Sequence, residues 1–112
     1  NQYCIELPHL VLTNNNNKTT AKFSNDKIKL ISILSSKKFA TAEKVEIRII
    51  SNLNNKNVNK SNYVILKPYP YWTNINLDDS ILIDEIQLEF KSKNQIKLGI
   101  EEIIIFKAKN KL

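Results

Sequence analysis

The most regular hydrophobic pattern of the chain lies between residues 81 and 106. Within it, Ile86, Leu88 and Phe90 alternate with acidic and amide side chains. This period of two is typical of a strand with one face in the core and the other in water. A polar turn at 91–95 follows, after which the inward alternation resumes. The pattern predicts two strands flanking a turn, and the rest of the domain must pack around them.

The second of these strands has apolar residues on both faces. Gly99 is the only glycine of the chain and falls inside the strand pattern, a position that usually marks a bulge or a close backbone approach. Four large apolar residues then follow in a row: Ile103, Ile104, Ile105 and Phe106. A bulge at Gly99 would turn Ile103 and Ile105 toward the core. Ile104 and Phe106 would then lie on the reverse side, so we expect this strand to be central and covered on both faces.

Four other stretches are rich in β-branched and aromatic residues, as strands are: residues 3–12, 27–34, 45–49 and 63–67. Pro8 interrupts the first stretch and belongs on an edge or at a bulge. In the second stretch we expect Ile28 and Leu30 to point inward, with a register change near Ile31.

The remaining segments are expected to connect the strands. Residues 13–20 and 52–62 are polar and rich in asparagine, and we expect both to be loops. Only residues 35–44 allow a short helix, because their alanines and glutamate tolerate one. Strands at short intervals with at most one short helix predict an all-β fold, an antiparallel β-sandwich or jelly roll.

Length and composition describe one domain. The chain has 112 residues, the usual size of a single domain, so we expect one β-sandwich domain over residues 1–112. It contains 17 isoleucines, 16 asparagines and no methionine. Because a complete translation product begins with methionine, we expect the domain to be cut from a larger protein.

The charge is positive but uneven. The net charge is +6; residues 1–77 carry 11 basic and 4 acidic groups, and residues 78–112 carry 6 basic and 7 acidic groups. The basic groups are lysines except for Arg48, and they are scattered along the chain. Since a nucleic-acid surface is richer in arginine and clusters its charge, a solvated lysine surface is the favoured interpretation.

Cys4 is the only cysteine, so no internal disulfide can form. No apolar run approaches the ~18 residues of a membrane span.

An aromatic segment with two prolines, KPYPYW at 67–72, is the candidate recognition element. The prolines hold its backbone extended and reduce the entropy lost on binding. Strand parity places Trp72 beside Asn74 and Asn76 on one face and Tyr71 on the opposite, core-directed face. An aromatic ring among amides suits a sugar, whose C–H face stacks while its hydroxyls need donors and acceptors. The candidate ligand-binding residues are therefore Tyr69, Tyr71, Trp72, Asn74 and Asn76. The alternative is that Trp72 closes one end of the sandwich as part of the core.

Acidic residues gather at two places in the second half of the chain: Asp78, Asp79, Asp84 and Glu85 at one, and Glu101 and Glu102 at the other. Carboxylates that lie close together can bind Ca²⁺, but no DxDxDG loop is present, and turns and strand edges also account for such acids. A pair of catalytic carboxylates like that of a glycosidase does not fit one small domain in which the sequence implies no cleft.

The sequence shows no catalytic motif. His9 is the only histidine and has no convincing nucleophile partner, and the common catalytic motifs are absent. We therefore expect no enzyme activity of the domain alone.

The C-terminal half contains a series of strand motifs in a fixed order: Trp72, then Ile75 and Leu77, then Ile86-Gln87-Leu88-Glu89-Phe90, then Glu102-Ile103-Ile104-Ile105-Phe106. This series resembles the closing strands of the galactose-binding-like (discoidin-type) jelly-roll superfamily. In that superfamily a Trp-containing strand precedes a strand of the form I-x-L-x-F, and the domain ends in a strand of the form E-I-x-I-F. The resemblance covers about 40 residues. It implies a non-catalytic accessory module of an extracytoplasmic enzyme or surface protein, which binds glycans and often holds a structural calcium ion. The family's acidic position would fall on Glu102.

Three functional hypotheses follow. The first is a carbohydrate-binding or adhesion module, periplasmic, secreted or surface-exposed, that recognises a glycan through the aromatic segment. The second is a structural or protein-interaction domain, a soluble part of a larger membrane or surface protein, that packs against its own parent. The third and weakest is electrostatic binding of nucleic acid or anionic lipid by the lysine-rich half, which requires a steep salt dependence.

Overall fold

The computed structural model describes residues 4–6, 11–15, 18–37, 44–91 and 100–108, and within these ranges the chain is all-β with no helix. The strands are β1 (Cys4–Glu6), β2 (Val11–Asn15), β3 (Lys18–Ser35), β4 (Glu46–Leu53), β5 (Lys56–Lys60), β6 (Val64–Ile65), β7 (Trp72–Asn76), β8 (Leu82–Lys91) and β9 (Ile100–Ala108). All of their pairings are antiparallel. The predicted all-β, antiparallel, sandwich-like architecture is confirmed.

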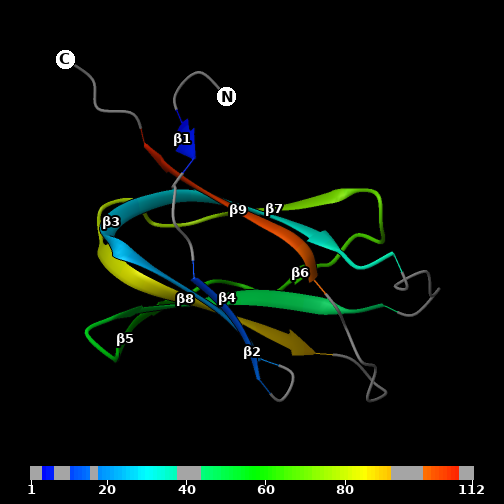
Figure 1. Ribbon diagram of the computed structural model, residues 1–112, viewed down its shortest axis with the longest axis horizontal. Helices are drawn as coiled ribbons and strands as arrows, with labels where there is room; N and C mark the ends of the chain where they lie inside the picture. The colour runs from blue at the N-terminus through cyan, green and yellow to red at the C-terminus, as the bar shows by residue number, and fades with distance from the viewer. Residues whose placement is uncertain (1–3, 7–10, 16–17, 38–43, 92–99, 109–112) are drawn as a thin grey trace.

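The strands form two layers that face each other (Figure 1). One layer, here called the β7 sheet, has the order β1-β9-β3-β7. The other, the β4 sheet, has the order β2-β3-β8-β4, with β5 and β6 both pairing with β4. β3 belongs to both layers, so a single hydrogen-bonded sheet curls over and packs against itself.

The bend in β3 is what closes the sandwich. The first half of β3, as far as Lys27, pairs with β2 and β8, and the second half, from Ile28, pairs with β9 and β7. The β3–β8 register shifts between Lys22 and Asp26, and the β3–β9 register shifts again just after Ile28. Such irregularities bend a strand and increase its twist, which allows one strand to leave one layer and enter the other.

The register change predicted near Ile31 is therefore real, but it falls between Ile28 and Leu30. After it, Ile31 and Ile33 are fully buried. Leu30 is half-buried, and its parity places it on the outer face of the sheet. The expectation that Leu30 points inward was wrong, because the bulge comes before this residue and reverses its parity.

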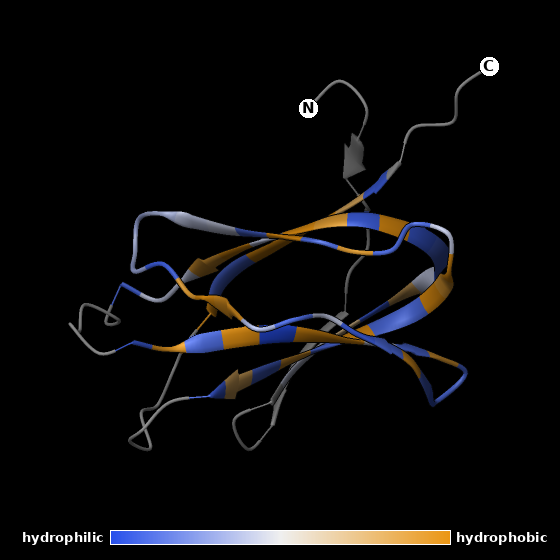
Figure 2. Cartoon of the chain, turned by 180° about the vertical axis from the view of Figure 1, so that it is seen from behind, coloured by the Kyte–Doolittle hydropathy of each residue, from blue (hydrophilic) through white to orange (hydrophobic). Residues whose placement is uncertain are grey.

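Isoleucine dominates the core between the layers. Among the described residues, the apolar side chains that are no more than 1% exposed are Ala21, Ile28, Ile31, Ile33, Val45, Ile47, Ile49, Ile86, Leu88 and Ile105. Hydrophobic and hydrophilic residues alternate along the strands that carry them (Figure 2). Burying each large aliphatic side chain stabilises the fold by ~1.5–3 kcal/mol. The predicted inward positions Ile86 and Leu88 are confirmed, whereas Phe90 is half-buried and packs at the margin of the core.

β8 and β9 are neighbours in sequence, yet they lie in different layers. β8 pairs with β3 and β4, and β9 pairs with β1 and β3. The expectation that the last strand is central is confirmed, and Ile103 and Ile105 do point into the core. Ile104 and Phe106 lie on the reverse face, as predicted, and are half-buried there.

Two predicted loops are hairpins instead. β2 extends to Asn15 and β3 begins at Lys18, so most of residues 13–20 is strand. In the 52–62 segment, β4 continues to Leu53 and β5 follows a turn in which Asn54 and Asn55 have φ of 51° and 65°. Asparagine tolerates this left-handed conformation better than other non-glycine residues. The loop predictions were wrong because polar asparagines pair through their backbones as other residues do.

The other differences are small. The strand predicted at 63–67 is reduced to Val64–Ile65, and that predicted at 3–12 appears as β1 and the start of β2. Ser35 ends β3, and most of the segment in which a short helix fits lies outside the described residues. Pro8, His9, the 92–95 part of the predicted turn and Gly99 also lie outside them.

Candidate functional site

The aromatic-amide pattern of the sequence falls on β7, a short strand at the edge of its sheet (Figure 1). Thr73 and Ile75 are 3% and 4% exposed and point into the sandwich. Asn74 and Asn76 are exposed, and Trp72 is half-buried. Strand alternation places all three on the outer face, so the parity predicted for β7 is confirmed. Trp72 is not part of the buried core cluster.

The same three residues carry the free backbone edge of the sheet. The N–H of Leu77 donates to the C=O of Lys29 on β3 at 2.9 Å, which sets the phase of the β3–β7 ladder. Because the backbone groups of an antiparallel strand alternate in direction, the N–H and C=O groups of Trp72, Asn74 and Asn76 point away from β3. In the described part of the chain, β3 is the only strand that pairs with β7.

A polar groove of about 430 Å³ lies beside this edge. One wall consists of residues 74–78, and the other consists of Asn59, Lys60, Ser61, Asn62 and Val64. The second wall belongs to the segment that leaves β5, so the groove lies where the edges of the two layers approach each other. Four asparagine side chains, one lysine and one aspartate make it rich in hydrogen-bonding groups and nearly neutral.

Tyr69 and Tyr71 lie in the turn that precedes β7. The N–H of Tyr71 donates to the C=O of Pro68 at 2.9 Å, and the Tyr69-Pro70 peptide bond is cis. Tyr71 is 66% exposed and Tyr69 is 36% exposed. The core-directed position predicted for Tyr71 was wrong, because the chain turns there and strand parity begins only at Trp72. Neither tyrosine lines the groove, and Trp72 does not line it either; of the five predicted ligand-binding residues, Asn74 and Asn76 do.

Buried polar contacts attach this turn to the sandwich. The Lys67 N–H donates to Thr73 Oγ1 at 2.8 Å, and the Ser35 hydroxyl donates to the Lys67 carbonyl at 3.2 Å. Thr73 and Ser35 are both buried. The aromatic segment is thus held at its base by hydroxyls from β7 and β3, while its tyrosines remain exposed.

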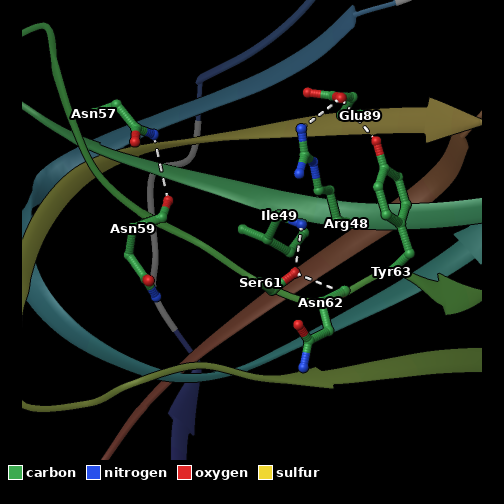
Figure 3. A network of polar contacts seen from close by, with 8 residues as sticks. All are labelled: Arg48, Ile49, Asn57, Asn59, Ser61, Asn62, Tyr63 and Glu89. Atoms are coloured by element: carbon green, nitrogen blue, oxygen red, sulfur yellow. Dashed lines mark hydrogen bonds and ion pairs between the residues drawn. The ribbon is translucent and has the colours of Figure 1, made fainter.

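The second wall of the groove is held by a polar network (Figure 3). The N–H of Ser61 donates to the Ile49 carbonyl at 2.9 Å, and the N–H of Ile49 donates to Ser61 Oγ at 2.8 Å. Two residues further on, the Tyr63 hydroxyl donates to Glu89 Oε1 on β8 at 2.8 Å. Residues 59–62 are therefore fixed to β4 and β8. The sequence carries no local signal for this, because Tyr63 and Glu89 are 26 positions apart.

Arg48 joins the network from the outer face of β4. Its Nη2 donates to Glu89 Oε1 at 2.8 Å, and its guanidinium carbon lies 4.7 Å from the centroid of the Tyr63 ring. Lys91 Nζ lies 5.5 Å from the same centroid. A partly exposed ion pair contributes ~0.2–1 kcal/mol by itself, so the cation–π packing on Tyr63 is of comparable importance.

The hydrogen bond between Tyr63 and Glu89 shifts the pKa of both groups. The bond donated by Tyr63, reinforced by Arg48, holds the pKa of Glu89 below its ordinary value of 4.5. The same bond, together with desolvation, raises the pKa of Tyr63 above 10.0. The neutral phenol and the ionised carboxylate therefore stabilise each other across the neutral pH range.

We predict a specific loss of stability at acid pH from this contact. Because the pKa of Glu89 is lower in the folded chain than in the unfolded chain, its contribution is complete above pH 4.5 and is lost as the pH falls through the folded pKa. In Glu89→Gln this part of the pH dependence should be absent. Urea denaturation of both proteins between about pH 6 and pH 3 measures it.

Tyr63→Phe is the matched control for that experiment. It keeps the ring under Arg48 but removes the hydroxyl, so the pKa of Glu89 should rise and the acid loss should shrink without disappearing. Identical pH profiles for the wild type and Glu89→Gln would contradict the assignment.

Several of the acidic residues considered as calcium ligands each interact with a different partner in the protein. Asp78 accepts two bonds from Ser80, from its hydroxyl at 2.6 Å and its N–H at 3.0 Å, which lower the pKa of Asp78. Asp84 accepts from the Asn54 N–H, and Glu85 accepts from Asn52 and lies 3.7 Å from Lys22 Nζ. Glu102 is exposed on β9. Among the described residues, no three His, Cys, Asp or Glu side chains come together as metal ligands would.

Comparison with known proteins adds no relative: no family model, curated protein or solved structure matches the chain. The resemblance to galactose-binding-like domains thus stays a prediction. No helix in the described ranges is long and apolar enough to cross a membrane.

Proposed function

We propose that this domain is a non-catalytic carbohydrate-binding module and that its ligand lies against β7. The observation that carries the proposal is the alternation of Trp72, Asn74 and Asn76 along a sheet edge on which no other described strand pairs. Asn74 and Asn76 also line a groove that contains further asparagines. A half-exposed indole supplies a stacking surface. Amide side chains and free backbone groups supply both the donors and the acceptors that sugar hydroxyls require.

The size and charge of the groove support the same ligand class. Its volume of about 430 Å³ lies within the ~300–1,000 Å³ of small-ligand sites. Among the described residues, Lys60 and Asp78 are the only charged ones that line it, so this lining offers no excess of charge for nucleic acid or another polyanion. On this proposal the domain is an accessory part of a larger extracytoplasmic protein.

A structural or protein-interaction role is the second candidate. The observation that favours it is the group of half-buried apolar side chains on the outer face of the β7 sheet, which includes Leu30, Leu34 and Phe106. In that role the domain packs against its parent protein and binds no free glycan.

Screening on a broad glycan panel separates the two candidates. The wild-type domain should bind a subset of glycans, and Trp72→Ala should weaken that binding about tenfold or more, since truncating an aromatic anchor that is buried on binding costs ~2 kcal/mol and ~1.4 kcal/mol already corresponds to tenfold. Trp72→Phe should retain a measurable part of it. Absence of binding by the folded wild type, or equal binding by Trp72→Ala, would contradict the carbohydrate proposal.

A further inference from the structure

The outer faces of the two sheets differ in chemistry. That of the β4 sheet carries cross-strand charge pairs, such as Arg48 with Glu89 at 2.8 Å and Lys22 with Glu85 at 3.7 Å. That of the β7 sheet carries a set of side chains, here called the outer platform, drawn from three strands: Leu30, Ser32, Leu34, Trp72, Asn74, Asn76, Ile104 and Phe106. The outer platform holds no basic residue, although the chain has 17.

The register arranges the outer platform in rows across the strands. Trp72 lies opposite Leu34, Asn74 opposite Ser32, and Asn76 opposite Leu30. On the other side of β3, Ile104 lies opposite Ser32, and Phe106 lies opposite Leu30. The row of Asn74, Ser32 and Ile104 is thus polar at the sheet edge. One neighbouring row consists of Asn76, Leu30 and Phe106, and the other consists of Trp72, Leu34 and Glu102.

By itself, the outer platform is smaller than a standard protein–protein interface. Three strands and five residues along β7, at a spacing of ~4.8 Å and a rise of ~3.4 Å, define a footprint on the order of 250 Å². Specific protein partners bury ~800 Å² each. A small ligand therefore fits the platform better than a folded partner.

The amide of Asn74 has a fixed orientation on this platform. The Ser32 hydroxyl donates to Asn74 Oδ1 at 2.6 Å, and Ser32 is itself only 8% exposed. The bond occupies the carbonyl side of the amide, so the exposed Asn74 presents its Nδ2–H donors to the ligand. The Nδ2–H groups of Asn74 are consequently the hydrogen-bond donors at the centre of the platform. Leu34 and Leu30 lie on either side of the neighbouring Ser32.

A donor surrounded by apolar side chains discriminates between sugars. An acetamido group offers a carbonyl oxygen for the donor and a methyl group for the neighbouring leucines. A bare hydroxyl in the same place can also accept from Asn74, but it carries no methyl group and leaves the neighbouring apolar surface unfilled. A carboxylate-bearing sugar finds no cation on the platform and lies near the exposed Glu102, which pairs with Leu34 in the register.

From this arrangement we infer that the glycan is an N-acetylated hexosamine chain, with Asn74 Nδ2 donating to the acetamido carbonyl and the methyl group lying against Leu34, which is opposite Trp72. Ser32 is a positioning residue, which acts through the orientation of Asn74. The inference rests on the carbohydrate-binding function proposed above and adds its ligand class.

The test compares two uncharged tetrasaccharides of equal length, chitotetraose and cellotetraose, by NMR titration of the folded domain. Chitotetraose should bind at least tenfold more tightly, and the side-chain amide signal of Asn74 should shift. Asn74→Asp, which replaces the donor by an acceptor, should remove the preference. Ser32→Ala should reduce it about threefold or more, because the amide can then rotate. Asn25→Asp adds the same charge at an exposed position of β3 away from the platform and should preserve it.

The outcomes separate the two proposals. Equal affinity for the two tetrasaccharides, or binding of cellotetraose alone, overturns the N-acetyl inference while the carbohydrate function stands. Binding of neither, with other glycans bound on the panel, also overturns the inference alone. Absence of binding to every glycan overturns both. An unchanged preference in Ser32→Ala or Asn74→Asp, with an unchanged fold by circular dichroism, overturns the roles given to these two residues.

Discussion

Replacing Ile105 with alanine should lower the free energy of unfolding by about 3 kcal/mol, within the ~2–5 kcal/mol that such truncations cost in a packed core. Ile105 is fully buried between the two layers. It lies opposite Ile31, another fully buried residue, so the cavity left by the mutation has rigid walls and cannot easily collapse. For a domain with a total stability of ~5–15 kcal/mol, the loss is large enough to be measured by urea denaturation.

Ile104→Ala is the matched control, because it removes the same atoms one residue earlier on the same strand. Ile104 is half-buried on the outer platform, so its truncation should cost about 1 kcal/mol or less. Equal losses for the two variants would contradict the assignment of inner and outer faces on β9. The pair therefore tests the sandwich itself, independently of any ligand.

Thr73→Val should destabilise the domain by about 1–2 kcal/mol although valine has almost the same shape. The substitution removes the oxygen that accepts the Lys67 N–H at 2.8 Å, and a donor left without its partner in a partly buried site costs ~1–3 kcal/mol. Because this bond attaches the aromatic segment to β7, the segment should also become less ordered. Denaturation measures the first effect, and hydrogen exchange of the Lys67 amide measures the second.

Thr73→Ser separates the hydrogen bond from packing. Serine keeps the acceptor and loses only a methyl group, so protection of the Lys67 amide should persist in this variant. If the amide were equally protected in Thr73→Val and Thr73→Ser, the bond would not be what holds the segment.

The local alternation of residues was enough to predict the strands and most of their inner faces. The burial of Ile86 and Leu88 follows directly from parity, because one face of each strand must leave water. The burial of Ile103 and Ile105 was predicted from parity together with a bulge at Gly99, which lies outside the described residues. Parity also predicted which face of β7 carries Trp72. Parity could not predict where the bulge in β3 lies. Because one extra residue reverses the parity of all later positions in the strand, Leu30 was assigned to the wrong face.

The local sequence pattern could not predict the asparagine-rich hairpins or the groove. In a chain with 16 asparagines, polar composition ceases to distinguish loops from strands, so β5 was missed. Asn59 and Asn62 reach the site only because β5 and the segment after it are carried to the edge of β7 by pairing with β4. That wall depends on the contact between Tyr63 and Glu89, a long-range pairing that no spacing along the sequence reveals.

The shared strand β3 has a consequence for how the domain comes apart. Because β3 pairs with strands of both layers, unfolding of one layer also removes pairing partners from the other. Opening at any point exposes the isoleucine core of the whole molecule, which makes partially opened forms costly. The path of β3 therefore makes unfolding cooperative, and the proposed recognition edge on β7 is expected to unfold together with the rest of the domain.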